Sequence, residues 1–315
     1  MKKYFINSTL LGLILLLFLK AESQNNLIIE EAKQITGGGY SIFKETMADM
    51  PWTEIEESIK NEAIVLLPVG VIEEHGPHAC CGADTYQAYL SARIVKKELN
   101  KRNIPALIAP PLYWGIAEIT NCFPGTFTVS ESTMRSILAD IFKSLKRWGV
   151  KNIVVFNGHG ETSHIEMLKN SIVESSIEKE FNIYFLIDEK ESNKFKTTVY
   201  KNCVIPVSYQ PKLKIESKFD NCHADCIETG TLAGFYPELT DTLLARSLEP
   251  TNFRNNKEFK TPADVGRAWA KDARRITPLG YFGDPASFNA SNSVINYIND
   301  SKNEAEAIES FFKKD

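Results

Sequence analysis

The sequence lacks several features that would place it in a common class of proteins. Its 36 lysines and arginines are balanced by 40 acidic residues, and the net charge of −4 excludes a strongly basic face for nucleic acid. It has no C-x₂-C pair, and six cysteines in 315 residues are too few for a disulfide scaffold. No internal repeat and no Pro/Ser-rich linker divides the chain. We therefore expect one domain that acts on a small molecule and binds no nucleic acid.

The chain also lacks an apolar run long enough to cross a bilayer. Its most apolar segment, residues 10–19, is well short of the ~20 residues that a spanning helix needs. Two lysines precede this segment and small residues follow it up to Ser23, which is the pattern of a cleaved export signal. We expect residues 1–23 to be a signal peptide and residues 24–315 to be the single domain. The protein is then exported, to the periplasm or beyond, without a stable membrane anchor.

Apolar runs alternate with amphipathic segments along the chain. Strands are predicted at 63–71, 104–112, 152–156 and 181–187, and helices at 51–60, 85–101, 130–148, 162–178, 224–233, 261–276 and 303–314. Continuous apolar strands between helices are typical of a mostly parallel sheet covered on both faces. The prediction is therefore the α/β class. Residues 188–222 show no regular pattern, and we expect an insertion or an oligomer contact there.

Histidine is scarce, and all five histidines stand near acidic residues in three short clusters. These are His75 and His78 with Glu73, Glu74 and Asp84; His159 and His164 with Glu161; and His223 with Asp225 and Glu228. The first two clusters follow the predicted strands 63–71 and 152–156, where open α/β sheets bind their ligands. Imidazole and carboxylate together suit Zn²⁺, Mn²⁺ or Fe²⁺. The pattern predicts a metal site.

The spacing of the first cluster favours a site for two ions. Glu73 and His75 are two residues apart and can face the same way in an extended segment, and Asp84 can return to bridge two ions. His159 adds an imidazole from a turn flanked by glycines. Either of two glutamates, Glu161 or Glu228, could complete the second ion's ligands.

Five segments resemble the signatures of the creatininase (creatinine amidohydrolase) family. Along the chain they are Val69–His78, Phe123–Thr126, Asn157–Gly160, His223–Thr229 and Gly283–Pro285, which is also their order in the family. The resemblance implies a three-layer α/β/α fold with a mostly parallel central sheet and a centre of two divalent metal ions. It also implies hydrolysis of a non-peptide or cyclic C–N amide bond, and a homo-oligomer that is often a hexamer.

The resemblance carries roles over to individual positions. Glu73, Asp84 and His159 match the ligands of one ion; His75, the bridging Asp84 and a glutamate match those of the other. Glu161 stands at the position of that glutamate, and Glu228 is the alternative, as a ligand or as a group that holds an imidazole. His223 matches the histidine that passes a proton to the leaving nitrogen after a metal-bound hydroxide attacks the carbonyl carbon. We expect His78 to orient a ligand or cap a turn, His164 to lie at the surface or beside a ligand, and Glu74 to be solvated.

The sequence departs from the family where a substrate would be recognised. Ala79–Cys81 replaces the usual Leu-Pro-Leu, and we expect the two adjacent thiols to serve in packing. Residues 114–120 lack the usual Ser and His, and Phe219–Cys222 stands where creatininase itself has a different set of an acid and aromatics. These changes spare the metal ligands but make creatinine an uncertain substrate.

Other functions remain open at this point. On the same fold the protein could be a formamide deformylase or a small-peptide amidase. It could also be a non-catalytic metal- or ligand-binding protein, although such a protein would be expected to lose a ligand and none of the four core ligands is missing. An unrelated flavodoxin-like module would need a glycine-rich phosphate loop where this chain has Glu73 and Glu74.

Overall fold

A computed structural model describes residues 27–28, 30–35, 39–176, 181–192, 202–217, 222–251 and 262–313. These residues form a five-stranded, wholly parallel sheet with the strand order β2-β1-β3-β4-β5. The strands are β1 (Ile64–Val69), β2 (Ala106–Ile108), β3 (Asn152–Asn157), β4 (Asn182–Asp188) and β5 (Val204–Val207). The predicted α/β class and parallel sheet are confirmed. The proposed signal peptide lies outside the described residues.

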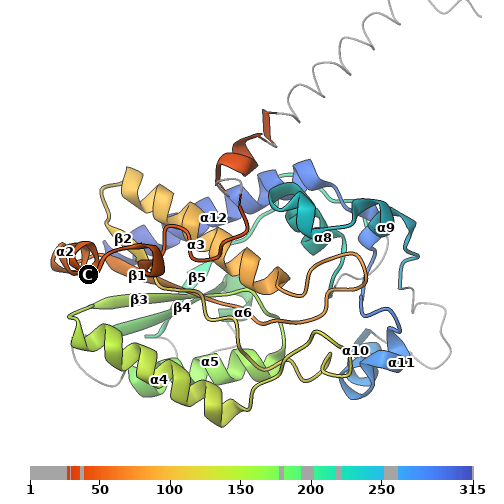
Figure 1. Ribbon diagram of the computed structural model, residues 1–315, viewed down its shortest axis with the longest axis horizontal. Helices are drawn as coiled ribbons and strands as arrows, with labels where there is room; N and C mark the ends of the chain where they lie inside the picture. Colours follow the sequence, from red (N-terminus) through yellow and green to blue (C-terminus); the bar gives the residue numbers. More distant parts are fainter. Residues whose placement is uncertain are drawn as a thin grey trace, which may run out of the picture.

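Helices cover both faces of the sheet. In Figure 1, α3 (Ala83–Lys101) and α12 (Ala290–Phe312) lie on one face, and α4 (Glu131–Arg147) and α5 (Thr162–Ser175) lie on the other. Further helices in the described part of the chain include η1 (Met47–Asp49), α2 (Trp52–Lys60), α6 (Glu189–Ser192), α8 (Cys226–Phe235), η2 (Pro237–Leu239), α9 (Thr242–Ser247), α10 (Pro262–Lys271), α11 (Ala273–Ile276) and η3 (Pro285–Ser287). None of the helices in the described ranges combines the length and apolarity that crossing a membrane requires.

The continuous apolar run of β1 has a simple cause. Alternate side chains of a strand point to opposite faces, and here both faces are buried. Val65 and Leu67 join the core against α4 and α5, whereas Leu66 packs with Val95 and Ile308 against α3 and α12. All six residues of β1 are buried, so no polar position interrupts the run.

The order of the strands decides where a ligand can bind. From β1 the chain passes through α3 to β2 on one side, then through α4 to β3 on the other side of β1. A crevice forms at such a switch point, beyond the carboxyl ends of the two central strands. Val69 at the end of β1 is paired with Asn157 at the end of β3. The loops that carry the first and second histidine clusters therefore leave the sheet side by side.

Three segments differ from the sequence prediction. The segment predicted to be irregular, 188–222, contains the fifth strand, β5, and the short helix α6. The predicted helix 261–276 is two helices, α10 and α11, and the C-terminal helix starts at Ala290 instead of 303. Its first turns are rich in Asn and Ser and look like a loop, but Ser293, Val294 and Asn296 are buried. Tertiary packing thus overrides weak helix propensity there.

Candidate metal centre

The loop after β1 is shaped by contacts with the start of α3. A Cβ on Gly70 would lie 2.6 Å from the backbone nitrogen of Thr85, so only glycine permits this close approach. The backbone N–H of Glu73 donates to the carbonyl oxygen of Cys81 at 2.8 Å. Nδ1 of His75 lies 3.0 Å from the carbonyl oxygen of Glu73, which leaves Nε2 of the same ring to face the site. Backbone contacts therefore aim both side chains.

Asp84, in the first turn of α3, faces two histidines. Its Oδ1 lies 3.2 Å from Nε2 of His75, and its Oδ2 lies 2.9 Å from Nδ1 of His159. The same Nδ1 atom lies 2.9 Å from Oε2 of Glu73. A carboxylate with one oxygen toward each imidazole occupies the position that a ligand bridging two ions requires.

The described residues contain three overlapping groups of potential ligands. They are Glu73 with Asp84 and His159; His75 with Asp84 and Glu228; and Glu73 with His75 and His223, each with its ligand atoms within 4.8 Å of one another. Glu73, His75, Asp84 and His159 are between 1% and 6% exposed. Ionisable side chains are seldom buried to this extent unless they are paired or bind a metal.

Several of these buried atoms have no hydrogen bond of ordinary geometry. They are Oε2 of Glu73, Nε2 of His75, Oδ2 of Asp84 and Nε2 of His159. Leaving a buried polar atom unpaired costs about 1–3 kcal/mol, more for a charged group. All four residues belong to the groups of potential ligands, and divalent cations bound there would give their ligand atoms partners. The donor set therefore fits the metal ions expected from the sequence.

The carboxylates also set the charge of the histidines. Burial lowers the pKa of His159, but the adjacent Asp84 and Glu73 raise it to about 10. Burial likewise lowers the pKa of His75, and Asp84 and Glu228 raise it well above its ordinary value. Without a cation, the imidazoles take up protons that balance the acids, and a metal ion would replace those protons.

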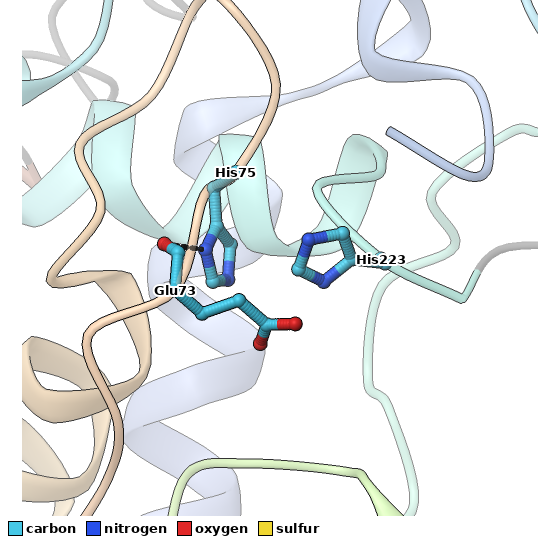
Figure 2. A group of neighbouring side chains, drawn as sticks. All are labelled: Glu73, His75 and His223. Atoms are coloured by element: carbon cyan, nitrogen blue, oxygen red, sulfur yellow. Dashed lines mark hydrogen bonds between the residues drawn. The ribbon is translucent and has the colours of Figure 1, made fainter. Parts of the chain in front are cut away.

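His223 enters the site from the segment before α8. Its backbone N–H donates to the carbonyl oxygen of Phe282 at 3.1 Å and its carbonyl oxygen accepts from the N–H of Phe282 at 2.8 Å. Its ring lies 4.5 Å from that of His75, and Figure 2 shows the carboxylate of Glu73 extending toward His223. Nε2 of His223 lies 2.7 Å from the carbonyl oxygen of Glu74. Burial lowers the pKa of His223, while the charge of Glu73 contributes to raising it to about 9.

The structure separates the two glutamates that the sequence left as alternatives. Glu161, expected as a ligand, is in none of the three groups: its Oε2 accepts the backbone N–H of Ile119 at 3.1 Å and its Oε1 accepts from the hydroxyl of Ser163. Glu228 lies in the group with His75 and Asp84, and its Oε2 is 3.7 Å from Nε2 of His75. The geometry thus favours Glu228 over Glu161 as the glutamate of the second ion.

Glu74, which was expected to be solvated, and His164, which was expected at the surface or beside a ligand, are both buried. Glu74 is 6% exposed, and its Oε2 accepts the N–H of Gly76 at 2.9 Å. His164 is 0% exposed, its Nδ1 accepts the N–H of Ile116 at 3.2 Å, and its ring lies 5.2 Å from that of His159. The expectation of a solvated Glu74 was wrong, and His164 lies beside a candidate ligand and not at the surface.

Two further observations concern residues whose role the sequence left open or missed. The hydroxyl of Thr120 donates to Oε1 of Glu73 at 2.5 Å and so holds that carboxylate. No sequence pattern identified this contact, because Thr120 lies in the stretch that departs from the family. Nε2 of His78 is 2.8 Å from the hydroxyl of Thr229 in α8, so His78 joins the first loop to this helix.

Comparison with known proteins finds relatives over most of this chain. The model of the creatininase family, described as creatinine amidohydrolase, matches residues 48–293. The creatinine amidohydrolase of Pseudomonas putida is 27% identical over 245 residues, which cover 73% of this chain and 88% of that protein. The 3-dehydro-scyllo-inosose hydrolase of Thermotoga maritima is 24% identical over 209 residues, 65% of this chain and 60% of its own. The mycofactocin precursor peptide peptidase of Mycolicibacterium smegmatis is 33% identical over 98 residues, 39% of its length.

Solved structures show the same fold. A crystal structure of creatininase superposes with a TM-score of 0.59 at 21% identity, covering 85% of this chain and 98% of that one. A putative creatinine amidohydrolase from Bacteroides fragilis gives a TM-score of 0.60 at 20% identity, covering 86% and 96%. Zinc and manganese forms of creatininase are also among the similar structures. With more than half of its length matched by the family model, this chain belongs to the creatininase family.

Proposed function

We propose that this protein is a metal-dependent amidohydrolase that cleaves a non-peptide or cyclic C–N amide bond of a small molecule. The position of Asp84 carries the proposal, since this buried carboxylate directs one oxygen at His75 and the other at His159. Such a placement is costly for a charged group unless cations share it.

Two divalent ions would be held by six contacts from five side chains. Glu73, Asp84 and His159 would hold one ion, and His75, Asp84 and Glu228 the other. Carboxylate and imidazole ligands suit Zn²⁺ and Mn²⁺ about equally, and Fe²⁺ fits them as well. Bound ions supply Lewis acidity, which polarises a carbonyl group and acidifies water.

His223 is the residue that we assign to proton transfer. It lies in one of the ligand groups, with Glu73 and His75, and its ring is held at Nε2 by the carbonyl oxygen of Glu74. A general acid must lie within reach of the departing nitrogen, and a positioned one contributes about 10²–10⁴-fold to the rate. The carboxylate of Glu161 accepts the backbone N–H of Ile119, which lies 42 residues earlier in the chain. We therefore assign Glu161 to shaping the loop beside the site and not to holding an ion.

The substrate is proposed only as a class. The names of the relatives describe hydrolysis of creatinine, of an inosose and of a peptide, so family membership alone does not select one of them. The proposed class is creatinine or a related small amide, with a formamide or a short peptide as alternatives, and the altered stretches at 79–81, 114–120 and 219–222 are where these substrates would be told apart. We further propose that the protein is exported through residues 1–23 and works as a homo-oligomer, with a hexamer as the first assembly to test.

Metal content and amide hydrolysis on the same preparation test this proposal. Protein purified without chelators is analysed by elemental mass spectrometry, then assayed by product chromatography for ring opening of creatinine and other cyclic amides and for cleavage of formamides and short peptides. The D84N variant is the control for metal-dependent turnover. Nearly two ions per chain, with turnover that chelator removes and metal restores, supports the proposal. No bound metal, and no uptake of Zn²⁺ or Mn²⁺, overturns it.

A further inference from the structure

An aromatic side chain from the C-terminal part of the chain lies against His223. Trp269 of α10 has its ring 5.7 Å from that of His223, with 43° between the planes. It is 8% exposed. Figure 1 shows α10 and α11 near the same end of the sheet as α8, although α10 follows α8 by a long stretch of chain. The contact therefore joins two parts of the sequence that local patterns do not connect.

The indole of Trp269 is itself fixed in place. Its Nε1–H donates to the hydroxyl of Thr277 at 2.9 Å, and that hydroxyl donates to the carbonyl oxygen of Ala273 at 3.0 Å. Its ring also meets that of Phe282 edge-on at 5.6 Å. A buried tryptophan whose N–H has a partner and whose faces are packed has little freedom to rotate.

Phe282 links Trp269 and His223 a second time. The backbone of Phe282 exchanges two hydrogen bonds with the backbone of His223, while its ring packs on Trp269. Trp269 and Phe282 belong to one apolar cluster with Phe123, Val265, Ala273 and Ile276. The main chain of His223 and the indole of Trp269 are thus both held by this apolar cluster.

The remaining contacts of His223 show what the indole adds. The ring of His75 lies 4.5 Å away, and Nε2 lies 2.7 Å from the carbonyl oxygen and 3.4 Å from the carboxylate oxygen Oε1 of Glu74. Both polar contacts are made by the same ring nitrogen, so they limit where that atom lies but leave rotation of the ring about it open. An aromatic face at 5.7 Å restricts that rotation.

We propose that Trp269 is a positioning residue that fixes the ring plane of His223 and so determines how well this histidine delivers its proton. The expected effect on kcat rests on the proposed function, whereas the fixed ring plane of His223 does not depend on it. Trp269 acts through His223 and has no assigned contact with the metal ligands. Loss of the indole should therefore lower kcat with little change in KM or in bound metal.

Two substitutions at one position separate the ring face from simple bulk. W269F keeps an aromatic face, W269L keeps apolar bulk without one, and I276A loosens the same apolar cluster but keeps the indole. We expect W269L to lower kcat about tenfold, part of what a positioned general acid contributes, with KM and metal content within twofold of the parent. W269F should recover most of kcat, and I276A should leave it within twofold. Equal losses in W269L and I276A would overturn the inference, as would full kcat in W269L.

Nuclear magnetic resonance of the histidine rings tests the same point without a substrate. The chain has five histidines, so spectra of zinc-loaded, ring-labelled protein are tractable, and H223Q assigns the signal of His223. We expect one sharp His223 signal in the parent and in W269F, and a broadened or split one in W269L. A single sharp signal in W269L would overturn the inference even if no amide proved to be a substrate. Should W269L fail to fold, T277V, which removes the partner of the indole N–H, replaces it with the same expectations.

Discussion

His75 and Asp84 meet through Nε2 and Oδ1 at 3.2 Å, and this contact joins the loop after β1 to the first turn of α3. The meeting depends on the turn between them, where Gly76 adopts a φ of 67° that glycine accepts at little cost. Asp84 reaches His159 with its other oxygen at 2.9 Å, so the carboxylate ties together the loops that follow β1 and β3. The loops at the carboxyl ends of β1 and β3 and the candidate metal centre therefore form one structural unit.

Replacing Asp84 tests its bridging position. D84N removes the charge that would be shared by two ions, and we expect both ions to be lost and turnover to fall by more than about 100-fold, because even residues beyond the ligands cost 10–100-fold in metal affinity. D140N, on the exposed outer side of α4, is the matched control and should behave like the parent. Metal content and turnover are measured together; two ions retained in D84N would rule out a bridging ligand at this position.

The choice between Glu228 and Glu161 can be settled with one pair of variants. E228Q should lose about one ion per chain, because Glu228 shares a ligand group with His75 and Asp84. E161Q should keep both ions, since the carboxylate of Glu161 serves the N–H of Ile119. Elemental analysis after dialysis decides; the opposite pattern would return Glu161 to the ligand position expected from the sequence.

Two glycines beside His159 should respond very differently to an added methyl group. A Cβ on Gly158 would lie 2.2 Å from the backbone oxygen of Asp84, whereas a Cβ on Gly160 would have nothing within 4 Å. G158A must push the start of α3 away from β3, and we expect it to lose about 1–3 kcal/mol of unfolding free energy together with bound metal. G160A should be close to neutral in both. Urea unfolding and metal content measure the difference, and equal behaviour of the two variants would contradict the predicted packing.

Glu304 predicts how stability depends on pH. Burial raises the pKa of Glu304 from 4.5 to about 7, although the hydroxyls of Ser91 and Tyr209 donate to its carboxylate. A folded pKa above the unfolded value means that the stabilising contribution is present below pH 4.5 and is lost as the pH rises through 7. Its full size is on the order of 3 kcal/mol.

E304Q should flatten this part of the pH profile. The parent is expected to lose unfolding free energy between pH 5 and pH 8, and the variant to lose less over the same range. Urea unfolding at both pH values, compared between parent and E304Q, isolates the contribution from other titrating groups. Identical slopes in the two proteins would contradict a raised pKa at Glu304.

Local patterns were sufficient for most of the fold. The apolar runs at 63–71 and 152–156 predicted buried parallel strands, because strands covered on both faces have no polar positions. The pattern failed for β5, which has only four residues, and for the first turns of α12. A four-residue strand is too short to show a period, and Asn- and Ser-rich turns become helical only when α12 packs against its neighbours.

Proximity along the chain was a good guide to the site only within each loop. It indicated that Glu73, His75 and Asp84 could converge, because a turn of a few residues joins them, and the structure brings them together with His159. It left Glu161 and Glu228 as alternatives, and the family resemblance favoured Glu161, whereas the structure places Glu228 in the candidate ligand group.

The sequence by itself determined the residue types, the strands and helices that carry them, and the edge of the sheet where they gather. These features depend on the periodicity of apolar residues and on the order of helices and strands, both of which can be read from the sequence. Only the tertiary structure decided that Glu228 lies in a group of potential ligands, that Glu74 is buried, and that Trp269 lies against His223. Such contacts join segments far apart in sequence, and they arise from how α8, α10 and the loops pack against the sheet.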